Sequence, residues 1–111
     1  MEWTQDGRTH RYEDPGPGTG PLSRLPVGSE LKVRVSLGPV SFYALTRLWS
    51  ADRIRVSWHD DSYAYRKAWI PARWVRTVTD EEYRAEEARR FAAVETRTRN
   101  GRAPGGARTR S

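Results

Sequence analysis

Residues 69–75 read WIPARWV and are the most informative part of the sequence for the fold. Their first residues close an aromatic and apolar run, residues 63–70, which is typical of a β-strand. Pro71 ends that run because proline has no backbone N–H to donate to a sheet. Residues 74–78 then form a second, shorter run. The sequence predicts two strands joined by a tight turn.

Three further strands are predicted upstream of this turn. Apolar and polar residues alternate over residues 31–37, which gives that strand one apolar face. A long run rich in Phe, Tyr, Leu and Trp covers residues 40–49. Alternation returns in residues 53–58, where we expect Trp58 to lie in the core. Residues 30–78 therefore carry five predicted strands.

Residues 69–75 resemble the Ile-Pro-Ser-Asn-Tyr-Val segment of SH3 domains, in which strand four passes through a 3-10 turn into strand five. The resemblance implies a mainly β, five-stranded SH3-like barrel with Ile70 and Val75 in its core. It also implies that Trp69, Pro71 and Trp74 match positions that face a proline-rich peptide. The short first connection, residues 37–39, is more similar to the barrels of Tudor domains and integrase C-terminal domains, many of which bind nucleic acid or protein tails.

Three segments flank the predicted barrel. Residues 1–29 combine a hairpin, indicated by Asp6-Gly7, with a linker rich in proline and glycine. Residues 79–95 form a C-terminal α-helix, because Thr79 and Glu82 have the spacing of a capping box. Residues 96–111 carry five arginines and no large apolar side chain, so we expect a disordered basic tail.

Composition argues against an enzyme. The 111 residues include no cysteine and only two histidines, and the sequence holds no phosphate loop or nucleophile motif. We expect no catalytic residue, metal or cofactor. No apolar run has the roughly 20 residues of a membrane span, and no signal peptide is evident, so we expect a cytoplasmic protein with no membrane partner. The arginine-to-lysine ratio of 18 to 2 is typical of a high-GC bacterial or phage genome.

The charge distribution favours nucleic acid as the partner. The net charge is +6, and the positive charge is concentrated in residues 30–78 and 96–111. Basic residues interleaved with aromatic ones can pair with phosphates and stack on bases. We expect binding to be largely independent of base sequence, because the predicted helix is acidic and would be repelled by phosphate. The candidate phosphate contacts are Lys32, Arg34, Arg47, Arg53, Arg55, Arg66, Lys67, Arg73, Arg97, Arg99 and Arg102.

The candidate stacking or peptide-binding side chains are Tyr43, Tyr65, Trp69, Pro71 and Trp74. They leave a second hypothesis open, a protein-interaction module that binds a peptide through Trp69, Pro71 and Trp74 or serves as an assembly adaptor. An open aromatic groove would favour a peptide, whereas a continuous basic surface would favour nucleic acid. A third interpretation treats the strand arginines as a solvated surface. The choice between DNA and RNA and the oligomeric state stay open.

Overall fold

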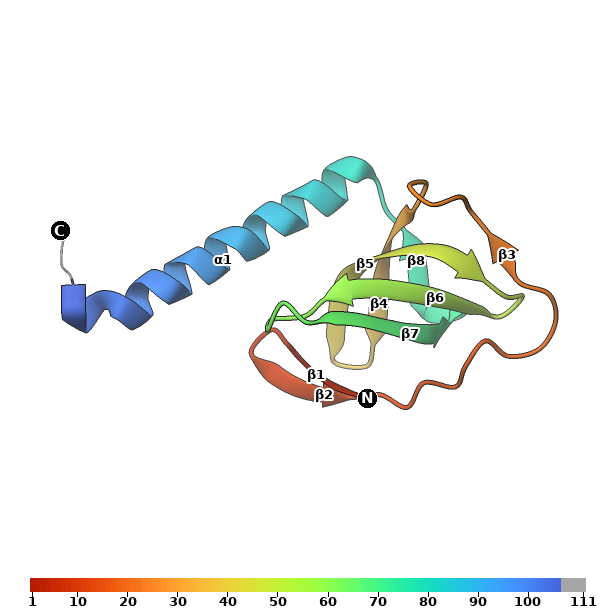
Figure 1. The fold of residues 1–111 in the computed structure, drawn as a ribbon, viewed down its shortest axis with the longest axis horizontal. Coiled ribbons are helices and arrows are strands. Elements are labelled where there is room, and N and C mark those ends of the chain that lie inside the picture. Colours follow the sequence, from red (N-terminus) through yellow and green to blue (C-terminus); the bar gives the residue numbers. More distant parts are fainter. Residues whose placement is uncertain (107–111) are drawn as a thin grey trace. The chain divides into compact units, whose positions relative to one another are not determined.

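The computed structural model describes the backbone of residues 1–106 and the side chains of residues 1–93. It is mainly β, with a compact, sheet-rich unit over Met1–Thr79 and one helix in a second unit that begins at Asp80 (Figure 1). In the part of the chain that is described, no helix has the length and apolar character needed to cross a membrane.

The chain opens with a hairpin of β1 (Glu2–Gln5) and β2 (Arg8–Arg11). Asp6 and Gly7 join the strands with φ angles of 54° and 78°, as a two-residue turn with two left-handed residues requires. The hairpin contributes to the core, because the Trp3 ring lies 5.7 Å from the Trp58 ring and 6.1 Å from the Phe42 ring, centroid to centroid.

The main sheet is antiparallel and has the order β7-β6-β5-β4-β8. Pro71 precedes the 3-10 turn η1, and the sheet is not closed, since β7 and β8 stay at its two ends. The short β3 pairs with the end of β5 outside this path. The elements are β3 (Ser23–Arg24), β4 (Leu31–Leu37), β5 (Val40–Trp49), β6 (Arg53–His59), β7 (Tyr65–Pro71), η1 (Ala72–Trp74) and β8 (Val75–Thr77).

The core follows the alternation of the strands. Every second side chain of β4, β5 and β6 points inward, so that Val33, Phe42 and Val56 are buried together. Trp58 and Ile70 are also buried, as expected. The alternate side chains of β4, β5, β6 and β7 form the opposite side of the sheet, which we call the outward face.

The segment predicted as a linker is tied to the sheet. Residues 12–25, here called the strap, follow the hairpin and end at β3. The Tyr12 hydroxyl donates to the Trp69 carbonyl at 2.7 Å, and the Trp69 N–H donates to the Asp14 carboxylate at 3.1 Å. Arg53 donates to the carbonyls of Pro15 and Gly16. Prolines remove backbone donors but keep their carbonyl acceptors, so a segment rich in proline can still be held by donors from the sheet.

The turn between β6 and β7 is built around a buried carboxylate. Asp60 is only 1% exposed and accepts from the Arg66 Nε atom at 2.9 Å and from the backbone N–H groups of Ser62 and Ala64. Asp61 ties the turn to the hairpin through its N–H, which donates to the Thr4 carbonyl. The turn therefore has a structural role.

The helix α1 (Asp80–Gly106) begins with three acidic residues, which favour the positive end of its dipole. It extends beyond residue 95, where we expected it to end. No glycine or proline occurs between Glu95 and Gly101, so the sequence offers no strong helix breaker there. Within the helix, Arg89 and Glu86 form an ion pair at 2.6 Å. The last part of the predicted tail, residues 107–111, lies outside the described residues.

Candidate nucleic-acid interface

The outward face carries a row of side chains that crosses four strands. Lys32 of β4 is paired with Leu45 of β5, and Leu45 with Ser57 of β6. Ser57 is paired in turn with Lys67 of β7. Residues paired across antiparallel strands project from the same face. Cations from β4 and from β7 therefore stand at the two ends of one row.

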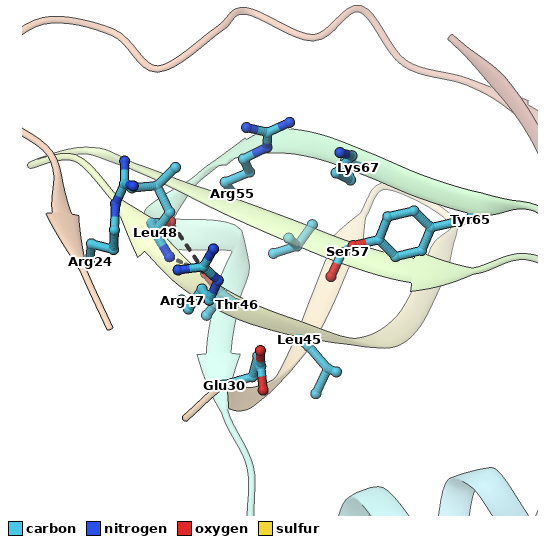
Figure 2. Close-up of a pocket in the computed structure, with 11 residues that line it drawn as sticks. Arg24, Glu30, Leu45, Thr46, Arg47, Leu48, Arg55, Ser57, Tyr65 and Lys67 are labelled. Carbon is cyan, nitrogen blue, oxygen red and sulfur yellow. Dashed lines mark hydrogen bonds between the residues drawn. The ribbon is translucent and has the colours of Figure 1, made fainter. Parts of the chain in front are cut away.

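A pocket of about 310 Å³ lies over the β5, β6 and β7 part of this face (Figure 2). Four of its lining side chains are cationic and one, Glu30, is a carboxylate. We call it the basic pocket. Its lining residues are Arg24, Glu30, Leu45, Thr46, Arg47, Leu48, Arg55, Val56, Ser57, Tyr65 and Lys67.

A β-bulge in β5 shapes one wall of the basic pocket. Thr46 is paired with Val56 and Leu48 with Arg55, so Arg47 is an extra residue in the ladder. The Thr46 hydroxyl closes the bulge, because it donates to the Leu48 carbonyl at 3.3 Å and accepts from the Leu48 N–H at 3.4 Å. A bulge redirects side chains that strict alternation would place on opposite faces. Arg47 and Leu48 can therefore both line the pocket although they are neighbours in sequence.

The strap supplies the fourth cation. The Leu25 N–H donates to the Arg47 carbonyl at 2.8 Å, and the Arg47 guanidinium donates to the Leu25 carbonyl at 3.1 Å. This exchange fixes β3 beside β5 and brings Arg24 to the pocket. Within the described residues, the guanidinium groups of Arg24 and Arg55 make no hydrogen bond or ion pair. The N–H groups of these two guanidinium groups are therefore available to a ligand.

An aromatic ring stands at another wall of the basic pocket, where Tyr65 is 57% exposed. The Lys67 ammonium lies 5.6 Å from the centre of its ring, and the His59 ring lies 5.3 Å away. Figure 2 shows Tyr65 and Lys67 on the same strand beside Ser57. The pocket therefore combines cationic donors with an accessible aromatic face.

Glu30 is held as a carboxylate. The backbone N–H groups of Glu30 and Gly28 hydrogen-bond to it, and the charges of Arg47 and Lys32 are close, so the pKa of Glu30 lies below its usual value. It remains an acceptor at neutral pH and repels anions from its own end of the pocket.

The structure brings some of the predicted site residues together. Arg47, Arg55, Lys67 and Tyr65 all line the basic pocket. Lys32 shares the row that crosses it, and Arg34 lies next to Tyr43 on the same face, with its guanidinium 5.8 Å from the Tyr43 ring centre.

Other predicted phosphate contacts lie outside the lining of the basic pocket. Arg53 donates to the strap carbonyls, and Arg66 is paired with the buried Asp60. The guanidinium of Arg73 stacks over the ring of Trp74 at 4.7 Å. Arg97, Arg99 and Arg102 lie beyond Ala93, outside the residues whose side chains are described.

The three residues predicted to face a peptide, in β7 and η1, differ in how far they are exposed. Trp69 is only 8% exposed, although its partner across the sheet is the outward-facing Arg55, and both of its backbone polar groups are bonded to the strap. Pro71 is partly buried, and Trp74 is 39% exposed. Of these three residues Trp74 is therefore the most exposed, and peptide binding through them stays a prediction.

Sequence reasoning missed Arg24, Glu30 and Leu48 as lining residues. Arg24 lies among prolines and glycines, and β3 is too short for any periodicity to be visible. Leu48 reaches the pocket through the bulge, which alternation cannot predict. Comparison of the chain with models of protein families, with curated proteins and with solved structures finds no match.

Proposed function

We propose that residues 30–78 are a five-stranded SH3-like barrel that binds nucleic acid. The strand order and the position of η1 between β7 and β8 support the fold assignment. In this proposal the chain is a cytoplasmic binding protein rather than an enzyme, and residues 96–111 act as a basic arm.

The observation that carries the binding proposal is the basic pocket. Four cations from three strands and the strap meet at one place, and only one carboxylate stands among the lining residues. Arginine suits this role, because its planar guanidinium matches phosphate and stacks on rings. Phosphate contacts do not depend on base identity, so we expect little sequence preference. The peptide-binding alternative has less support, because the strap occupies the backbone of Trp69.

The test is a salt titration with a matched pair of double variants. Arg24→Gln with Arg55→Gln removes two charges from the pocket without breaking a side-chain bond within the described residues, whereas Arg8→Gln with Arg11→Gln removes two charges from the hairpin. Binding to a labelled 20-nucleotide DNA, single-stranded and duplex, is followed by fluorescence anisotropy. Each lost phosphate contact should reduce the slope of log affinity against log salt by about 0.7–0.9. We expect the pocket variant to lose about 1.5 from that slope.

The hairpin variant should keep the slope of the unchanged protein, because its arginines are outside the pocket. Equal losses in both variants would mean that only net charge matters. Absence of measurable binding by the unchanged protein at low salt, to either DNA or RNA of the same length, would exclude the proposal.

A further inference from the structure

The basic pocket has two chemical halves. Arg24, Arg47 and Arg55 supply cationic donors, whereas Tyr65 and Leu45 offer aromatic and apolar surface. A phosphate needs the first kind of surface, and the face of a nucleobase needs the second. The volume, about 310 Å³, falls at the lower end of the range of small-molecule sites, which suits a ligand of nucleotide size.

We propose that the basic pocket receives one unpaired nucleotide of a single strand, with its base against Tyr65 and its phosphate at the arginines. This inference rests on the proposed function and adds to it a ligand class, single-stranded nucleic acid, and a stacking residue.

Tyr65 is placed for stacking. Its ring is more than half exposed and belongs to the pocket wall, so a base can reach it without displacing core side chains. Trp69, the next aromatic residue on the same face of β7, is buried and unavailable. Among the lining residues, Tyr65 is the aromatic one. The nearby Lys67 ammonium adds a positive charge to the same wall.

Glu30 fixes which way the nucleotide lies. Its carboxylate repels a phosphate, while Arg24 and Arg55 hold guanidinium donors with no bond to the rest of the described chain. The phosphate therefore goes to the arginines, and the carboxylate is left to accept from a base N–H group.

Duplex DNA cannot fill the pocket in this way without disruption. In a duplex both faces of each base are stacked on neighbours, and turning a base out costs a few kcal/mol. A single strand exposes its bases at a much smaller cost. The pocket should therefore prefer single strands, even though the phosphate contacts alone are available from either form.

The experiment compares three labelled ligands of equal length by anisotropy at fixed salt. They are a single strand, the same strand with abasic sites at every second position, and a duplex. Because one base stacked on an aromatic side chain strengthens binding by about tenfold, we expect the intact strand to bind about tenfold more tightly than the abasic strand. Tyr65→Leu should remove that difference, whereas Tyr65→Phe, which keeps the ring, should retain it.

Tyr63→Leu is the matched control. Tyr63 is 65% exposed, lies two residues away and is outside the pocket lining, so its loss should leave the tenfold difference in place. Equal affinity for the intact and abasic strands, with the effect of the arginine double variant preserved, would overturn the stacking inference and leave the proposed function standing. If the unchanged protein binds none of the three ligands, both the stacking inference and the proposed function are excluded.

Discussion

At the scale of single residues, charge partners decide which cations can meet a ligand. Arg66 and Arg55 both lie within predicted strands. The Arg66 side chain forms an ion pair with Asp60, whereas the Arg55 guanidinium makes no hydrogen bond or ion pair within the described residues. Sequence alone could not separate these two, since the partner of Arg66 is set by the turn between β6 and β7.

Asp60 provides a prediction at this scale. Burial raises the pKa of Asp60, but hydrogen bonds from Arg66, Ala64 and Ser62 outweigh that effect and hold the pKa below its usual value. A lowered pKa in the folded state means that ionised Asp60 stabilises the fold above about pH 4, the pKa of an unfolded aspartate, and that this stabilisation is lost as pH falls through the folded pKa.

We therefore expect Asp60→Asn to lower the free energy of unfolding by about 1–3 kcal/mol at pH 7. The difference from the unchanged protein should shrink below about pH 4. Urea denaturation at pH 7 and at pH 3 measures both quantities. A difference that stays constant over this range would mean that the carboxylate charge is not what stabilises the turn.

At the scale of elements, the hairpin is part of the fold's core. Trp3 is buried against Phe42 and Trp58, so Trp3→Ala should lower the free energy of unfolding by about 3–5 kcal/mol. Trp74→Ala, at a partly exposed position, should cost under about 1 kcal/mol. Denaturant midpoints measure both variants. Similar losses would show that Trp3 does not pack as the structure has it.

The five strands of the main sheet could be predicted from the sequence, because alternation and Pro71 mark them. The strap and the bulge could not. Every residue has a backbone carbonyl, so the hydrogen bonds to the Pro15 and Gly16 carbonyls cannot be recognised from residue types. The bulge at Arg47 interrupts no apolar–polar alternation that the sequence shows. The pocket depends on both of these elements. Three of the four pocket cations could therefore be predicted from the sequence, but the pocket itself could not.

At the scale of the whole molecule, the chain divides after Thr79. The hydrophobic core described for the first unit lies entirely between Trp3 and Val75. A chain ending at Thr79 should thus unfold at the same denaturant concentration as the full chain. It should also keep its preference for intact over abasic strands, while its salt slope falls because the arginines after residue 95 are lost. A lower midpoint for the shortened chain would mean that the helix stabilises the sheet.

The strap also covers part of an exposed sheet edge. β7 is an edge strand of the sheet, and an edge strand offers unpaired backbone groups to any other extended chain. The Asp14 carboxylate accepts from the Trp69 N–H, and the Tyr12 hydroxyl donates to the Trp69 carbonyl. The backbone groups in the middle of the β7 edge are therefore already hydrogen-bonded to side chains. The prolines that follow cannot extend the ladder. A segment rich in proline and glycine thus lowers the tendency of the β7 edge to pair with the sheet edge of another molecule.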